Sequence, residues 1–404
     1  MTSTKARYGD AIQASPPPAE YKYEMYDSVG AVNTEHWNSA SCHTTSLFMN
    51  LGFIAAVEQS MSSHAAFRHV ILYDEQSRPV GCASFCIYRV DLTTLAGRVI
   101  KALAGGIRRV FPSFGYVTML FCGLPVSIGQ NSVALIRECD PGRAVETLDG
   151  IMGKLAKQEG IRFSVFKEFS AEECNMMDRL LPHGYWRFET PRMHFFPPRF
   201  RSFERYTDAL KSHYRYDIKR SKRKLAESGF TITRLRDGEQ IAKVYTSELH
   251  RLYENVVSKA ENKLEVLPKD FFREVAKRFS GAVSLTLISS DDRTLAFNYS
   301  LSAGDSYWFL FCGIDYRFNR QADLYFNLMY QDLENGFHEG VSSVQVGQAS
   351  EHFKARLGCE SVPLFFYIKT DGVLRMLIRW GSFILFPPRP PVVRFDVFKA
   401  QRRP

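Results

Sequence analysis

The fold is decided by residues 313–368, which read GIDYRFNRQADLYFNLMYQDLENGFHEGVSSVQVGQASEHFKARLGCESVPLFFYI. A strand that ends at Gly313 leads into an arginine-bearing turn and then into a helix over 322–335, where apolar residues recur at helical spacing. After Glu339-Gly340 come the alternating strand SSVQVG, a short helix and the strand PLFFYIK. This order of elements predicts an α/β (α+β) fold with a mixed sheet flanked by helices.

The same order of elements occurs in both halves of the chain. Runs at 284–288 and 295–302 flank the turn SSDDR, and runs at 69–73 and 80–90 flank DEQSRP, so each half is predicted to contain a β-hairpin. A helix and a Glu-Gly pair follow each hairpin, which predicts a tandem duplication of one unit. The predicted parts are a disordered leader (1–20), an N-terminal acceptor-side domain (21–195), a C-terminal transferase domain (196–372) and an amphipathic, Pro/Arg-rich tail (373–404).

Composition agrees with a folded chain of two or three domains. The 404 residues are 45% hydrophobic and 24% charged, with a formal charge of +9, which excludes disordered and collagen-like classes. The eight cysteines are scattered without zinc-ligand spacing, so no metal site is predicted. The start of the sequence contains no apolar signal segment, and no run of about 20 apolar residues occurs, so a cytoplasmic location is expected.

Positive charge is concentrated in a predicted helix at 205–227. From Lys211 to Lys224, seven of fourteen residues are Lys or Arg. On a helix, Arg215, Lys219 and Lys222 form a cationic stripe beside an apolar side that can pack. The stripe predicts binding of a phosphate-bearing substrate, and a solvated charged face is the alternative.

Residues 313–368, together with this basic helix, resemble the C-terminal domain of the Fem-type (FemABX) aminoacyltransferases and the related BioF-like acetyltransferases, within the GNAT superfamily. The resemblance implies tandem GNAT-like domains and transfer of an acyl group to an amine. In GNAT enzymes an RxxGxG/A loop at a helix N-terminus binds the pyrophosphate of coenzyme A through backbone N–H groups. The matching residues are Arg317 and Ala322, while Arg320 replaces the first glycine, so these three residues are predicted to bind the donor phosphate.

The resemblance also implies a catalytic pair, Phe353-Lys354. The lysine would stabilise the negative charge that develops during acyl transfer, and the phenylalanine would shape the pocket. The neighbouring His352 is the candidate general base, because its ordinary pKa is close to neutral. The pair occurs once in the chain, since the first half has Arg179-Leu180 at the comparable position.

The predicted function is therefore N-acyl transfer, either acetyl or aminoacyl, to a small-molecule or peptide amine. The donor is expected to be acyl-CoA, an acyl carrier protein or aminoacyl-tRNA, with no tightly bound cofactor and no DNA partner. A Fem-like role in cell-envelope or peptide natural-product synthesis is one alternative, and a non-catalytic membrane or RNA adaptor is another. The cationic, apolar segments 98–111 and 373–386 suggest peripheral contact with the inner face of a membrane, and packing against the other domain or a second copy of the chain is the alternative.

Overall fold

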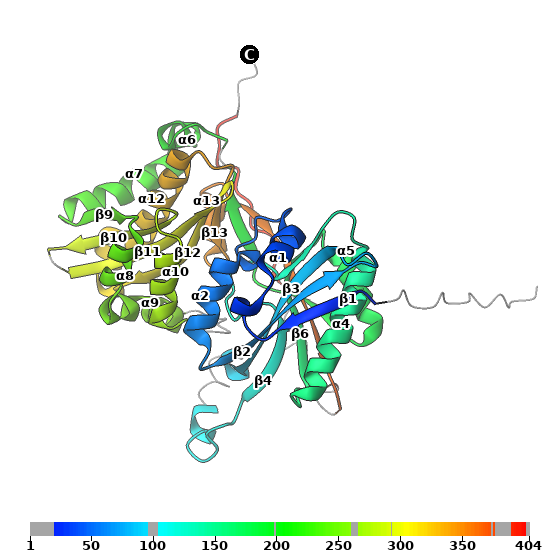
Figure 1. Cartoon of the computed structure of the whole chain (residues 1–404). Coiled ribbons are helices and arrows are strands. Elements are labelled where there is room, and N and C mark those ends of the chain that lie inside the picture. Colours follow the sequence, from blue (N-terminus) through cyan, green and yellow to red (C-terminus); the bar gives the residue numbers. More distant parts are fainter. Residues whose placement is uncertain are drawn as a thin grey trace, which may run out of the picture.

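The computed structural model describes residues 20–95, 104–197, 199–259, 266–291, 293–372, 375 and 389–400. The predicted leader, apart from Glu20, and the predicted segment 373–386, apart from Arg375, lie outside these residues. The described chain forms two mostly antiparallel sheets that stand side by side with helices on their faces (Figure 1). This arrangement confirms the predicted fold class.

The first sheet has eight strands in the order β1-β2-β3-β4-β6-β15-β7, with β5 paired to β3. The predicted first hairpin is confirmed as β2 and β3, and β4 runs parallel to β6 after a helical crossover. The strand bounds are β1 Lys22–Tyr26, β2 Ala65–Tyr73, β3 Pro79–Asp91, β4 Tyr116–Cys122, β5 Val133–Leu135, β6 Phe163–Ser170, β7 Trp186–Glu189 and β15 Leu364–Thr370.

Helices cover both faces of this sheet. One face carries α1 (Thr34–Ser41) and α2 (Leu51–Met61), and the other carries α4 (Pro141–Gln158) with α5 (Cys174–Met177) beside it. Short 3-10 turns lie at Val29–Ala31, Leu47–Met49, Leu92–Leu95 and Asp178–His183.

The second sheet has seven strands in the order β14-β8-β13-β12-β11-β10-β9. The predicted second hairpin is β10 and β11, and β12 runs parallel to β13 for only three residue pairs. The strand bounds are β8 Met193–Phe196, β9 Thr231–Leu235, β10 Val283–Ser290, β11 Arg293–Ala303, β12 Ser306–Ile314, β13 Ser343–Gly347 and β14 Glu360–Val362.

The helices of the second sheet are again on both faces. On one face, α12 (Leu324–Glu339) packs on the strands with α7 (Ser212–Glu227) outside it, and α8 (Gly238–Val244), α9 (Ser247–Lys259) and α10 (Lys269–Arg278) cover the other. The predicted helix 205–227 is two helices, because the chain turns between α6 (Phe203–Ala209) and α7 at Leu210, which is extended. The remaining helices are α11 (Tyr316–Ala322) and α13 (Glu351–Arg356).

The two sheets exchange strands across the predicted boundary at 195/196. β15 follows the second sheet in sequence but lies between β6 and β7 of the first sheet. Conversely, most of β8 precedes the boundary, yet β8 pairs with β13 and β14 of the second sheet. The sequence repeat therefore does not coincide with the two sheets.

One continuous apolar core joins the two sheets. It includes residues of α2 and of α10, and the rings of Phe53 and Phe271 meet edge to face across this contact, 6.0 Å apart. The relative position of the two sheets is thus fixed by buried aromatic packing.

Candidate active site

Lys354 lies buried where two parallel strands diverge. β12 and β13 pair only from Ser306 to Trp308 on the β12 side, after which they separate. α13 carries Lys354 into this gap, and its Nζ donates a hydrogen bond of 2.8 Å to the carbonyl oxygen of Gly347, the last residue of β13. Gly347 has a φ of +78°, and a Cβ there would lie 3.8 Å from the lysine nitrogen. The left-handed backbone conformation favours glycine at this position, whereas a Cβ would make only an ordinary contact with the ammonium group.

The lysine has an electrostatic environment unlike that of a surface lysine. Burial lowers the pKa of Lys354 to about 7. No carboxylate of the described residues forms an ion pair with it, and Cys312 and Cys359 stay neutral beside it because burial raises the pKa of each thiol to about 12. Near neutral pH the site can therefore present a positive charge that no protein anion neutralises.

His194, which the sequence analysis did not predict, completes this polar cluster. It lies on β8, and its Nδ1 is 3.1 Å from the same Gly347 oxygen. Burial, reinforced by the positive charge of Lys354, lowers the pKa of His194 to about 4, so the ring is neutral and Nδ1 donates. Its Nε2 is a buried acceptor without a partner among the described residues. No sequence motif marks this residue. Its place in the site was also hidden, because it precedes the predicted domain boundary and only the pairing of β8 with β13 brings it to Gly347.

The three predicted catalytic residues point in different directions on α13. Phe353 stacks on Phe326 of α12 with ring centroids 4.5 Å apart. His352 is exposed and meets Phe395 of the C-terminal segment edge to face at 5.0 Å. Only Lys354 of the three enters the gap between the strands. The catalytic roles of all three stay predictions.

The loop that precedes α12 is built differently from a pyrophosphate-binding loop. Residues 316–322 form the helix α11, and Asp315 accepts hydrogen bonds from the backbone N–H and the guanidinium of Arg317. Asp323 sits at the N-terminus of α12 in the left-handed region, with φ of +47°, and its carboxylate pairs with Lys224 at 2.9 Å. The Asp323 carboxylate is thus turned toward α7, where Ser221 also donates to it at 2.9 Å, and it accepts no hydrogen bond from the N-terminal N–H groups of α12.

The three predicted phosphate ligands lie along this helix. Arg317 is 70% exposed and ion-paired to Asp315, and Ala322 is buried. Arg320 is exposed, and its guanidinium makes no ion pair or hydrogen bond with the described residues. Their role in binding donor phosphate stays a prediction.

The predicted cationic stripe on α7 is largely paired within the protein. Lys222 contacts Glu334 at 3.1 Å, and Arg215 contacts Asp208 of α6 at 3.7 Å. Lys219 is exposed and has no ion pair within the described chain. The apolar side of the helix is buried against α11 and α12, as the sequence predicted.

The family model for FemAB-like proteins, described as peptidoglycan biosynthesis/recognition, matches residues 115–371. The chain belongs to the FemAB-like family. The match begins at the end of the β3–β4 connection and ends just after β15, so it includes the Lys354 gap, the whole second sheet and five of the eight strands of the first sheet.

Three solved structures are similar to this chain over most of its length, and the similarity to FemX extends to the fold. FemX is 11% identical with a TM-score of 0.53, and the match covers 88% of this FemAB-like chain and 99% of FemX. L-PGS from Bacillus licheniformis is 11% identical with a TM-score of 0.45, over 82% of this chain and 96% of that one. A tandem GNAT protein from the clavulanic acid biosynthesis pathway is 10% identical with a TM-score of 0.48, over 87% and 99%. No curated protein matches the chain.

In the first sheet of this FemAB-like chain a different lysine fills the corresponding gap between parallel strands. Lys167, on β6, is buried and donates to the carbonyl oxygens of Leu124 and Val126 at 3.0 and 2.9 Å. Its stem lies against Gly123, where a Cβ would come within 2.6 Å of it. This gap is therefore occupied by a lysine whose hydrogen bonds are satisfied, in contrast to Lys354.

A buried carboxylate from the first sheet reaches the end of β13. Glu168 has a φ of +65°, and its Oε1 accepts a hydrogen bond of 3.2 Å from Gln348, the residue after Gly347. A left-handed conformation at a buried glutamate costs energy, and such strain is common at functional sites. Sequence reasoning missed Glu168, because only the fold places the end of β6 beside the end of β13.

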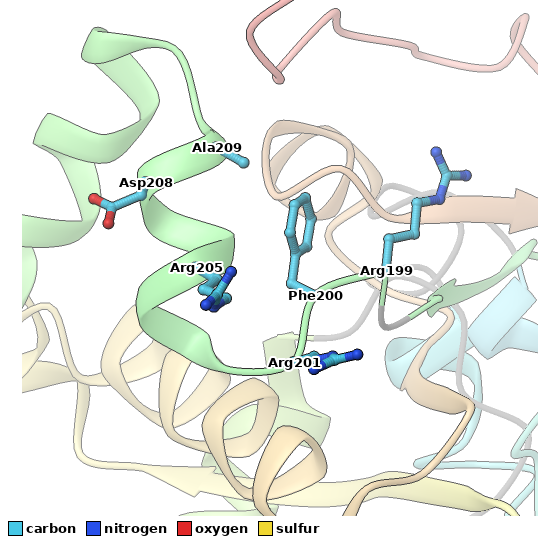
Figure 2. Close-up of a pocket in the computed structure, with 6 residues that line it drawn as sticks. All are labelled: Arg199, Phe200, Arg201, Arg205, Asp208 and Ala209. Carbon is cyan, nitrogen blue, oxygen red and sulfur yellow. The ribbon is translucent and has the colours of Figure 1, made fainter. Parts of the chain in front are cut away.

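A surface cavity of about 790 Å³ lies beside α6 (Figure 2). Arg201 and Arg205 are exposed there without ion pairs among the described residues, while Arg199 pairs with Glu360. Tyr206 of the same helix donates a hydrogen bond of 2.9 Å to the carbonyl of Leu357, which ends α13. The cavity is lined by Arg199, Phe200, Arg201, Arg205, Asp208 and Ala209.

The described residues contain no group of three or more His, Cys, Asp or Glu side chains placed to hold a metal ion. Within the same residues, no helix has the length and apolar character needed to cross a membrane.

Proposed function

We propose that this FemAB-like protein transfers an aminoacyl group from aminoacyl-tRNA to an amine, with formation of an amide. The observation that carries the proposal is the Lys354 ammonium, which is buried between diverging strands beside His194 and has no carboxylate partner in the described structure. The amine nitrogen attacks the ester carbonyl, the ester C–O bond breaks, and the ribose hydroxyl leaves with the proton that the amine gives up.

The charge of Lys354 suits the intermediate of this reaction. Attack on the carbonyl produces an oxyanion, and a fixed cation in a site that excludes water stabilises it without rearrangement. Because Gly347 takes one hydrogen bond from Nζ, the remaining N–H groups are available to the substrate. Removal of one such donor typically costs a factor of about 10²–10³ in kcat.

The loop before α12 supports aminoacyl-tRNA over acyl-CoA as the donor. The backbone N–H groups of Arg317 and Phe318 are bonded to Asp315, and the N–H of Tyr325 is bonded to Asn319 at 3.1 Å. These N–H groups are therefore not available to bind the pyrophosphate of coenzyme A. Membership of the FemAB-like family suggests an aminoacyl donor instead.

Two other features would bind the rest of the substrates. The arginines of the α6 cavity offer bidentate donors for the phosphates of a tRNA acceptor end. Glu168 and Gln348 bring polar groups from both sheets to the end of β13, where the acceptor amine would enter. The family description suggests a peptide of a peptidoglycan precursor as the acceptor.

The test is a transfer assay with a purified peptidoglycan-precursor peptide as acceptor. Labelled aminoacyl-tRNA and labelled acetyl-CoA are supplied in separate reactions, and the modified peptide is detected by intact mass. We expect product from aminoacyl-tRNA alone. Product from acetyl-CoA alone would overturn the donor assignment, and no product from either donor would favour the non-catalytic adaptor.

A further inference from the structure

A group of exposed apolar side chains lies at the tip of the β3–β4 connection. We call residues 104–116 the β3–β4 tip. Val110 is 72% exposed and Phe111 66%, far more than is usual for such large apolar residues. Five of the twelve most exposed large apolar residues of the described chain lie in this short segment: Ile107, Val110, Phe111, Phe114 and Tyr116.

The tip has a defined shape. Arg108 pairs with Asp91 through two hydrogen bonds of 2.9 and 2.6 Å, and its Nε donates to the carbonyl of Phe114 at 2.8 Å. The backbone N–H of Phe111 donates to the carbonyl of Ile107 at 2.9 Å. Arg108 therefore holds the base of the tip, and the apolar side chains remain outside this internal network.

The charged side chains of the tip itself are all positive, and the Asp91 carboxylate at its base is paired with Arg108. Residues 104–118 contain no Asp or Glu. Arg109 is exposed, and the exposed Arg89 lies over the ring of Tyr116 at 4.6 Å from its centroid. Exposed aromatic and aliphatic side chains with arginines at their base match the boundary between acyl chains and anionic headgroups of a bilayer.

The position of the tip favours a membrane over a folded protein as its partner. In Figure 1 the segment extends beyond the end of β4, away from both sheets. A stable protein interface needs about 800 Å² on each partner, which a broad face provides more readily than a narrow projection. A projection of this kind can instead enter the interfacial layer while the protein body stays in water.

We infer that the β3–β4 tip inserts into the surface of a bilayer that contains anionic lipid, and that this contact holds the protein at the membrane. The inference is independent of the proposed transfer reaction, because it uses no residue of the Lys354 site. The β3–β4 tip overlaps the segment 98–111 that the sequence analysis singled out, of which the structure describes residues 104–111.

The experiment is co-sedimentation of the full chain with vesicles of phosphatidylcholine, with and without phosphatidylglycerol. We expect binding to the anionic vesicles and at least about tenfold weaker partition for the double variant Val110→Ser, Phe111→Ser, because two exposed apolar groups are removed. Ile232→Ser is the matched control, since Ile232 is also exposed but lies on β9, and it should bind like the wild type. Arg109→Gln should weaken binding only to the anionic vesicles.

A second measurement reports insertion directly. Val110→Trp in the full chain should be quenched by vesicles that contain brominated lipid, by more than the wild-type tryptophans are. Absence of vesicle binding by the wild type, equal binding by the double variant, or no additional quenching of Trp at position 110 would each overturn the inference. Loss of a protein complex in the double variant, without any vesicle binding, would overturn it in favour of a protein partner.

Discussion

At the level of single residues, the contrast between two buried lysines defines the candidate site. Lys167 and Lys354 each fill a gap between parallel strands, but Lys167 gives hydrogen bonds to two carbonyls and to Ser127, and Lys354 gives one to Gly347. A lysine with satisfied hydrogen bonds supports structure. A lysine with unused donors and a lowered pKa is available for chemistry.

The first prediction separates these two roles by substitution. Lys354→Met should lower kcat by about 10²–10³ without loss of stability, because methionine retains the stem and removes a costly buried charge. Lys167→Met is the matched control. It should lower the free energy of unfolding by about 1–3 kcal/mol, because carbonyls are left unpaired, and keep most activity. Assay of kcat and thermal unfolding on both variants checks this, and normal activity of Lys354→Met would contradict it.

The second prediction follows from the pKa of Lys354, which burial lowers to about 7. The proposed mechanism needs the protonated form, which is lost as pH rises through the pKa. The kcat of transfer should therefore fall about tenfold per pH unit well above 7, and the residual activity of Lys354→Met should lack this dependence. A kcat that rises through pH 7 would instead identify the neutral amine as a general base.

At the level of elements, α6 and α12 each carry a testable group. α6 bears Arg205 and follows Arg201, both at the cavity of Figure 2. α12 buries Asp332 against β11, where Ser300 donates to its Oδ2 at 2.8 Å and Asn298 also donates to it. The first group faces solvent and can meet a substrate, whereas the second belongs to the core.

The third prediction concerns the arginines at α6. The double variant Arg201→Gln, Arg205→Gln should raise the KM for aminoacyl-tRNA by about tenfold or more and leave kcat unchanged, because phosphate contacts add affinity that is common to ground and transition states. The matched control is Arg251→Gln, an exposed residue of α9. An unchanged KM at low salt would place the donor elsewhere on the surface.

The fourth prediction concerns Asp332, whose pKa burial raises to about 7. Between its ordinary pKa and pH 7, the Asp332 carboxyl is protonated in the folded state and ionised in the unfolded state. The free energy of unfolding is therefore highest at low pH and falls as the pH rises toward 7. Asp332→Asn keeps the shape of the side chain and removes its titration, and the amide oxygen can still accept from Ser300 and Asn298. Relative to this variant, the wild type should lose up to about 1.4 kcal/mol per pH unit in that range.

Chemical denaturation of both proteins from pH 4 to pH 8 measures this difference. The variant should be the more stable protein at pH 8. Parallel stability curves across the range would contradict the assignment.

At the level of the whole molecule, the strand exchange makes the two sheets dependent on each other. β15 lies between β6 and β7, and its Tyr367 is buried and donates to Asp178 at 2.7 Å. A sheet that lacks an internal strand exposes two unpaired edges and part of its core. The first sheet therefore needs a segment that the chain supplies only after it has passed through the second sheet.

The fifth prediction tests this dependence. Residues 20–192 alone should show no cooperative unfolding transition, whereas the same fragment linked to residues 363–371 should regain one. Circular dichroism during thermal unfolding distinguishes the two cases. A cooperative transition in the fragment without the added strand would show that β15 is dispensable for the first sheet.

The sequence by itself determined the class of elements and much of their order. Hydrophobic periodicity and turn residues act over a few neighbouring positions. They predict the two hairpins, α7 with its buried apolar side, α12, and the short helix that carries Phe353-Lys354. The family resemblance pointed to Lys354 in the same way, because the motif is local.

Only the tertiary structure decided which strands pair and which groups meet. His194, Glu168 and Gln348 reach the end of β13 from separate parts of the chain, and β15 crosses to the first sheet. These choices depend on long-range burial, because the free energy gained by covering apolar faces is independent of separation along the chain. The family resemblance therefore pointed to the lysine, and the fold placed it in a buried site.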